Sequence, residues 1–154
     1  MPRRKPPATT PAPALHGHGE VILFIEDNRA VRELMVAVFK RFDYKPLVAE
    51  TVEDALDLWK GYQLAIHAVV SDCDLGHDRT GLSLLHEFAL AKPGLVLILA
   101  SGSLTAPLVQ ELERTTTIKC LPKPFAFQEL LGLLRAGLDA RPQPTQKQAQ
   151  LSKP

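Results

Sequence analysis

Residues 21–28 have the sequence VILFIEDN, five apolar residues followed by the acids Glu26 and Asp27 and then an asparagine. An unbroken apolar run of this length is typical of a strand buried on both faces of a parallel sheet. The apolar residues that come next recur at the spacing of an amphipathic helix, namely Val31, Leu34, Met35, Val38, Phe39 and Phe42. This stretch therefore predicts a strand–helix unit with an acidic pair at the carboxyl end of the strand.

The same succession of an apolar run and a helical pattern recurs four more times along the chain. Further strands are expected around 47–49, 66–71, 95–100 and 118–121, and further helices at 51–59, 82–89, 105–114 and 127–138. With connections this short, right-handed crossovers give a parallel sheet with helices on both faces. The sequence predicts an α/β fold, a flavodoxin-like doubly wound (βα)5 sheet of five parallel strands in the order 2-1-3-4-5.

The chain of 154 residues has room for one domain, which we expect over residues 20–138. Residues 1–19 and 139–154 lack hydrophobic periodicity and hold most of the 13 prolines, so both are expected to be disordered tails. Of the 18 basic and 17 acidic residues, six basic residues and one acid lie in these tails, which leaves the core with a net charge of −4. This balance argues against direct nucleic-acid binding.

Membrane and targeting signals are lacking in the sequence. No apolar stretch has the length of a membrane span, and prolines and threonines follow Arg3, Arg4 and Lys5 where a secretory signal would have an apolar region. Cys73 and Cys120 are too few for a disulfide scaffold, so free thiols are expected. We therefore expect a cytoplasmic location and no membrane partner.

Polar groups stand at the end of four of the predicted strands. Glu26 and Asp27 follow the first strand, Asp72 follows the third, Ser101 closes the fourth and Lys123 follows the fifth. In an open α/β sheet, ligands bind at the edge where the strands have their carboxyl ends. The order 2-1-3-4-5 makes the first and third strands neighbours, so the three acids are expected to meet.

These residue types suit a magnesium-assisted phosphorylation of an aspartate. Close carboxylates repel one another, and Mg²⁺ offsets that charge while keeping several waters and taking one or two carboxylates as ligands. A carboxylate can also act as a nucleophile and form an aspartyl phosphate. In this scheme Asp27 would hold the metal, Lys123 would contact the phosphoryl group and Ser101 would donate a hydrogen bond to it. Taken singly, each residue has an ordinary explanation as a cap or turn residue.

Four segments resemble the motifs of response-regulator receiver domains of two-component phosphorelays: VILFIEDN, VVSDCDLG with TGLSLL, LILASGS and CLPKPF. The resemblance covers residues 20–138. It implies that Asp72 is the phosphoacceptor and that Mg²⁺ is held by Glu26, Asp27 and Asp72 with the backbone carbonyl of Asp74. It also implies that Ser101 and Lys123 contact the phosphoryl group and that a cis peptide bond precedes Pro124.

The resemblance also implies the kind of partner. A sensor histidine kinase or a histidine phosphotransfer protein would supply the phosphoryl group, and the chain would be a signalling phosphoprotein rather than an enzyme. Because no effector domain follows Leu138 in this sequence, output is expected through binding to a downstream protein partner or by onward transfer of the phosphoryl group.

Three positions depart from the family pattern. Gly76 stands where the family most often has proline, and one extra residue comes before Gly81. Cys120, three residues before Lys123, replaces an aromatic switch residue, and a small thiol cannot make the same rotamer exchange. Asp74 adds a carboxylate near the proposed nucleophile.

Two other functions are open at this stage. The pair Asp72 and Asp74 resembles the DxD motif of haloacid-dehalogenase-type phosphatases, although that motif normally opens the first strand and the chain after it is short. The third possibility is a receiver fold that is not phosphorylated and serves only as a docking module, for which Cys120 is the main support.

Overall fold

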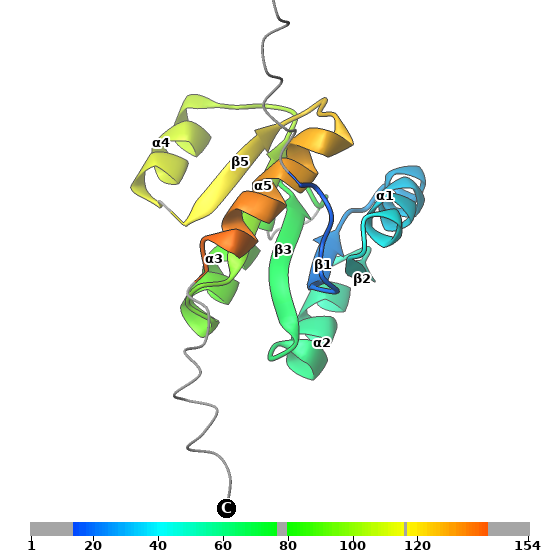
Figure 1. Ribbon diagram of the computed structural model, residues 1–154. Helices are drawn as coiled ribbons and strands as arrows, with labels where there is room; N and C mark the ends of the chain where they lie inside the picture. The colour runs from blue at the N-terminus through cyan, green and yellow to red at the C-terminus, as the bar shows by residue number, and fades with distance from the viewer. Residues whose placement is uncertain (1–13, 77–79, 116, 142–154) are drawn as a thin grey trace, which may run out of the picture.

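Strands and helices alternate through the computed structural model, which describes residues 14–76, 80–115 and 117–141 (Figure 1). The strands are β1 Val21–Ile25, β2 Lys45–Ala49, β3 Ile66–Asp72, β4 Val96–Ser101 and β5 Ile118–Pro122. The helices are α1 Arg29–Arg41, α2 Val52–Tyr62, α3 Gly81–Ala91, α4 Ala106–Arg114 and α5 Phe127–Asp139. All strand pairs are parallel and the order is β2-β1-β3-β4-β5, as the sequence predicts.

Helices cover both faces of this sheet and define two apolar clusters. Helices α1 and α5 lie on one face, where Phe39 and Leu134 pack against strand residues such as Phe24. Helices α2 and α3 cover the other face, where Trp59 stacks on Phe88 with ring centroids 4.2 Å apart. Since the central strands are buried on both faces, they read in the sequence as apolar runs, interrupted in β3 only by His67 before the polar strand ends.

Side-chain caps explain where four of the helices begin. Asn28, Thr51, Thr80 and Thr105 each accept a hydrogen bond from the backbone N–H three residues ahead. The helix predicted from Thr51 to Trp59 extends to Tyr62, and β2 begins two residues earlier than predicted, at Lys45. Lys45 and Pro46 at the start of β2, and Lys60 and Gly61 near the end of α2, do not continue the apolar pattern, so the pattern could not locate these ends.

A close approach of α3 to β3 requires glycine at position 81. The Gly81 N–H donates to the Cys73 carbonyl at 3.0 Å, and a Cβ at this position would collide with the Asp72 carbonyl oxygen. This contact closes the loop that leaves β3. The same loop contains Gly76 with a φ of +74°, a conformation that L side chains rarely adopt.

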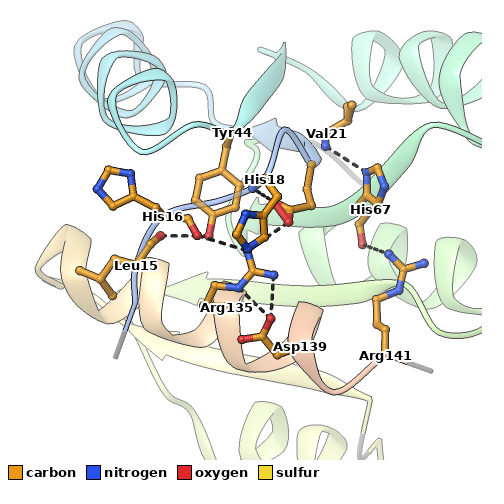
Figure 2. A network of polar contacts seen from close by, with 10 residues as sticks. Leu15, His16, His18, Val21, Tyr44, His67, Arg135, Asp139 and Arg141 are labelled. Carbon is orange, nitrogen blue, oxygen red and sulfur yellow. Dashed lines mark hydrogen bonds and ion pairs between the residues drawn. The ribbon is translucent and has the colours of Figure 1, made fainter. Parts of the chain in front are cut away.

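Residues 14–19, which the sequence places in a tail expected to be disordered, make hydrogen bonds to the turn after α1. The Gly17 N–H donates to the Phe42 carbonyl at 2.7 Å, and the Gly19 N–H donates to the Asp43 carbonyl at 2.9 Å. The Tyr44 hydroxyl donates to the carbonyl of Leu15 at 3.1 Å (Figure 2). Most of these bonds are between backbone groups, which leave no periodic signal in the sequence. In the tail predicted from residue 139, Asp139 is the last residue of α5 and Ala140 caps it. The remainder of the two predicted tails, residues 1–13 and 142–154, lies outside the described residues.

A buried guanidinium ties this segment to α5 at the amino edge of the sheet. Arg135 is ion-paired with Glu20 at 3.1 Å and with Asp139 at 2.8 Å, and it donates to the carbonyl of His16 at 3.4 Å (Figure 2). On β3, the neighbour of β1 in the sheet, Nδ1 of His67 accepts a hydrogen bond from the Val21 N–H at 3.0 Å. In the part of the chain that the structure describes, no helix is long and apolar enough to cross a membrane.

Candidate functional site

Three carboxylates meet at the carboxyl edge of the sheet. Ile25 at the end of β1 lies opposite Ser71 of β3, so the residues that follow them, Glu26 and Asp72, lie side by side. Each of Glu26, Asp27 and Asp72 has a carboxylate oxygen within 4.8 Å of one on each of the others. The strand order thus joins acids that are far apart in the sequence, in a spacing that fits a shared divalent cation.

Lys123 reaches this group from the end of β5. Its Nζ lies 3.1 Å from Asp72 Oδ1 and 3.6 Å from Glu26 Oε2. Its backbone N–H donates to the Ser101 carbonyl at 2.8 Å, which fixes the loop after β5 against the end of β4. The peptide bond between Lys123 and Pro124 is cis, as the family resemblance implied.

The balance of charge leaves the acids short of cations. Burial is the largest cause that raises the pKa of Glu26, and the charge of Asp72 and a hydrogen bond with Asp27 raise it further. A hydrogen bond from the Asn28 N–H and the charge of Lys123 lower this pKa, but the net shift is upward. Burial alone would lower the pKa of Lys123, but its hydrogen bond and charge attraction to Asp72, together with Glu26, outweigh burial and raise it. Lys123 is therefore a fixed cation, and one cation among three acids leaves an attraction for a further positive charge.

Ser101 and Asp74 have local partners. The Ser101 hydroxyl donates to the Ser103 carbonyl at 3.0 Å and accepts the Ser103 N–H at 3.3 Å, and it also contacts the Cys73 thiol just after β3. The Asp74 N–H donates to Asp72 Oδ1 at 3.4 Å, whereas the Asp74 carboxylate accepts the Gly76 N–H at 3.2 Å. The extra carboxylate of Asp74 is thus engaged in shaping the loop after β3.

A cavity of about 390 Å³ opens beside the acids. It is lined by Phe24, Glu26, Val31, Asp72, Ala100, Lys123, Pro124 and Phe125. Five of these eight lining residues are apolar, and Asp72 and Lys123 reach the cavity from two different strand ends. The carboxylate of Asp72, which belongs to a residue only 9% exposed, is therefore accessible through this opening.

Arg32 of α1 is a site-supporting residue that the apolar pattern of the sequence did not reveal. Its Nη1 donates to the carbonyls of Glu26 at 2.9 Å and Asp27 at 2.7 Å, and its Nη2 lies 3.5 Å from Glu50 Oε2. A signal for it exists, because the first turn of α1 carries no acid and begins with Arg29. Cations near a helix N-terminus oppose the helix dipole, so a structural or functional reason for them should be sought.

Helix α4 packs against the domain more loosely than the other helices. It has no buried residue, and only Leu108 and Leu112 pack as partly buried side chains against the apolar cluster. Cys120 of β5 is half-buried and lies opposite Leu99 of β4 in the strand register. Both cysteines are free thiols, as expected.

The family model for the response regulator receiver domain matches residues 22–135, a segment that includes all five strands except the first residue of β1. The chain belongs to this family. Receiver domains are phosphoacceptors in two-component signalling, and they bind Mg²⁺ at an acidic pocket, which corresponds here to the group of Glu26, Asp27 and Asp72. Membership favours the receiver interpretation over the phosphatase suggested by the DxD pattern. No curated protein matches this chain.

Solved receiver domains share the fold at low sequence identity. A CheY-like receiver domain protein from Methanospirillum hungatei JF-1 is 20% identical, with a TM-score of 0.72 over 80% of this chain and 96% of that one. The signal receiver domain of an HD domain-containing protein from Pseudomonas fluorescens Pf-5 is 23% identical, with a TM-score of 0.72 over 80% and 97%. The non-phosphorylated HemR receiver domain from Leptospira biflexa is 22% identical, with a TM-score of 0.69 over 80% and 97%.

Proposed function

We propose that Asp72 accepts a phosphoryl group, with Mg²⁺ held by Glu26, Asp27, Asp72 and the backbone carbonyl of Asp74. The observation that carries this proposal is the position of Lys123 Nζ, 3.1 Å from Asp72 Oδ1 in a group of three acids. An ammonium fixed beside one carboxylate is suited to hold an incoming phosphoryl oxygen. The donor set, carboxylates with a carbonyl, suits a hard divalent cation such as Mg²⁺.

The reaction needs little from the protein beyond position and charge. A carboxylate oxygen of Asp72 forms a bond to phosphorus while the bond from phosphorus to the donor nitrogen breaks. The electron pair of that bond goes to the nitrogen, which takes a proton from solvent. Bound Mg²⁺ supplies charge neutralisation at the phosphoryl oxygens.

Lys123 and Ser101 have separate tasks after transfer. Lys123 moves from pairing with the Asp72 carboxylate to pairing with a phosphoryl oxygen, which lies farther from the end of β3. The Ser101 hydroxyl exchanges its bond with the Ser103 carbonyl for one to the phosphoryl group, and this change would pull on the loop that leads to α4. The loose packing of α4 makes it the element that such a change moves most easily.

The donor and the output are part of the same proposal. A sensor histidine kinase or a histidine phosphotransfer protein supplies the phosphoryl group in the cytoplasm, and the changed surface is read by a downstream protein partner. The expected response is a shift between two pre-existing conformations. Cys120 occupies the position of the usual aromatic switch, so the signal to the partner passes through the Ser101 loop and α4 rather than through an aromatic rotamer.

Phosphorylation by a small donor tests the assignment directly. The protein is incubated with phosphoramidate and Mg²⁺ and its intact mass is measured. Wild type should gain one phosphoryl group, Asp72→Asn should gain none, and Asp74→Asn, the matched change two residues away, should still gain one. Equal labelling of wild type and Asp72→Asn would show that the assignment is wrong.

The docking alternative predicts a different result. A receiver fold used only for docking would gain no phosphoryl group and would bind no Mg²⁺. If wild type is unlabelled with phosphoramidate, and a Mg²⁺ titration followed by NMR shifts no amide near Glu26 or Asp72, the docking function replaces the one proposed here.

A further inference from the structure

We propose that Arg32 is a positioning residue that sets the affinity of the acidic group for its divalent cation. This inference rests on the proposed function. Arg32 touches no carboxylate of the acidic group; its contacts are to the backbone carbonyls of Glu26 and Asp27, at 2.9 and 2.7 Å. Residues that orient metal ligands in this way typically change metal affinity by 10–100-fold when they are replaced.

The guanidinium fixes two successive peptide planes. One nitrogen, Nη1, donates hydrogen bonds to both carbonyls, so the backbone on either side of Asp27 is held toward α1. The loop is fixed from other directions by the Glu26 N–H, which donates to the Ala49 carbonyl at 3.1 Å, and by the Asn28 N–H, which donates to Glu26 Oε1 at 3.2 Å. With the backbone held in this way, the two acidic side chains keep a fixed relation to Asp72.

Arg32 is itself held in place. Its side chain is only 14% exposed, and its Nη2 lies 3.5 Å from Glu50 Oε2 just after β2. Its backbone N–H donates to the Asn28 carbonyl at 3.0 Å within the first turn of α1. The contacts therefore connect β2 and α1 to the loop after β1, so the metal site is supported by two elements that contribute no proposed ligand.

Electrostatics and positioning predict opposite effects of removing Arg32. As a nearby cation, Arg32 repels a divalent cation, so its charge alone would make Arg32→Gln bind metal more tightly. As the group that holds the loop, Arg32 prearranges the ligands, so Arg32→Gln should bind more weakly. Arg29 on the same helix is a matched control, because it forms an exposed i,i+4 ion pair with Glu33 and, among the described residues, makes no hydrogen bond to the loop carbonyls.

The test measures Mn²⁺ binding by the loss of the free-ion EPR signal. Arg32→Gln should weaken Mn²⁺ binding by about 10-fold, whereas Arg29→Gln should leave it unchanged or slightly tighter. Arg32→Lys keeps the charge but cannot bridge two carbonyls and Glu50 together, and it should also bind more weakly than wild type. Full affinity in Arg32→Lys or in Arg32→Gln would overturn the inference.

A second readout separates positioning from loss of fold. The rate of phosphorylation by phosphoramidate is measured against Mg²⁺ concentration. Arg32→Gln should need about 10-fold more Mg²⁺ for half the maximal rate and should reach a similar maximal rate. An unchanged Mg²⁺ requirement at the wild-type labelled fraction would contradict the inference. A lower labelled fraction at every Mg²⁺ concentration would instead show that the variant is partly unfolded, and the decision then rests on Glu50→Gln.

Glu50→Gln keeps the inference testable if Arg32→Gln does not fold. It removes only the ion pair that anchors Arg32 and should weaken Mn²⁺ binding by a smaller factor than Arg32→Gln. Unchanged binding in Glu50→Gln, with Arg32→Gln unfolded, would count against a positioning role. Failure of the proposed function is recognised separately, because wild type itself would then bind no Mn²⁺ and gain no phosphoryl group.

Discussion

Two glutamates lie at the two ends of β1 and have opposite surroundings. Burial is the largest cause acting on the pKa of each, and it favours the neutral acid in both. At Glu20 the His18 N–H and the Arg135 guanidinium outweigh burial and hold the pKa below its usual value. At Glu26 the Asn28 N–H and Lys123 do not outweigh burial, so the pKa of Glu26 is raised. The amino edge of the sheet is electrostatically satisfied and the carboxyl edge is not.

This difference separates a structural polar network from a functional one. At the amino edge Arg135 lies between Glu20 and Asp139, so both of these acids have a cationic partner. At the carboxyl edge the acids outnumber the single lysine that touches them. A protein gains no stability from crowding carboxylates, so such a group marks a place where a ligand completes the charge balance.

The largest expected effect is at the amino edge. Arg135→Met removes the partner of Glu20, whose side chain is only 13% exposed, and leaves that carboxylate buried. Removing one member of a buried ion pair costs about 3 kcal/mol. Arg29→Met, which breaks an exposed ion pair, should cost less than about 1 kcal/mol. Urea unfolding of the three proteins measures the difference, and equal stability of the two variants would mean that the amino-edge network is not structural.

A paired substitution at both ends of β1 tests the difference in sign. In EDTA, Glu26→Gln should raise the free energy of unfolding, on the order of 1 kcal/mol, because it removes a charge that the fold disfavours. Glu20→Gln should lower it, because it removes a charge that Arg135 stabilises. The same denaturation assay measures both. If both changes shift stability in the same direction, the two edges do not differ as described.

The sequence predicted much of the carboxyl edge and little of the amino edge. The meeting of Glu26 and Asp72 followed from the strand order, because apolar runs locate the strands and polar residues mark their ends. The attachment of residues 14–19 depends mainly on backbone hydrogen bonds and on Arg135, and neither has a periodic signal. The direction of the Ser101 hydroxyl depends on its loop, and the contacts of Arg32 are to carbonyls, which every residue carries.

Acidification should affect the two edges in opposite ways. A carboxyl group with a raised pKa stabilises the fold at low pH, and that contribution is lost as pH rises through the folded-state pKa, as expected for Glu26. A carboxyl group with a lowered pKa, such as Glu20, contributes above its unfolded pKa and loses the contribution as pH falls. His67 also loses a stabilising contribution on acidification, and because its ordinary pKa of 6.5 is above that of a carboxyl group, the stability of the amino edge begins to fall nearer neutral pH.

The smallest expected effect comes from His67, which serves as an acceptor only when its Nδ1 is unprotonated. It accepts the Val21 N–H at 3.0 Å, at the point where the register between β1 and β3 shifts. Burial lowers the pKa of His67 from 6.5, and the charges of Arg141 and Lys92 lower it further, against an opposing effect of Glu20. The neutral ring therefore stabilises the fold fully above pH 6.5, and this contribution is lost as pH falls through the lower folded-state pKa.

His67→Asn isolates that contribution, because the Asn oxygen can accept the Val21 N–H and does not titrate. The stability of wild type relative to His67→Asn should fall by about 0.5 kcal/mol between pH 7 and pH 5, the size expected for a partly exposed group. The same substitution at His18, whose residue is exposed, reports what a histidine outside the sheet contributes. His67 differs from His18 in its burial, its nearby cations and its bond to Val21. A difference that is flat with pH, or equal for both variants, would mean that the β1–β3 junction tolerates a charged ring. The amino edge would then depend less on exact pairing than its contacts indicate.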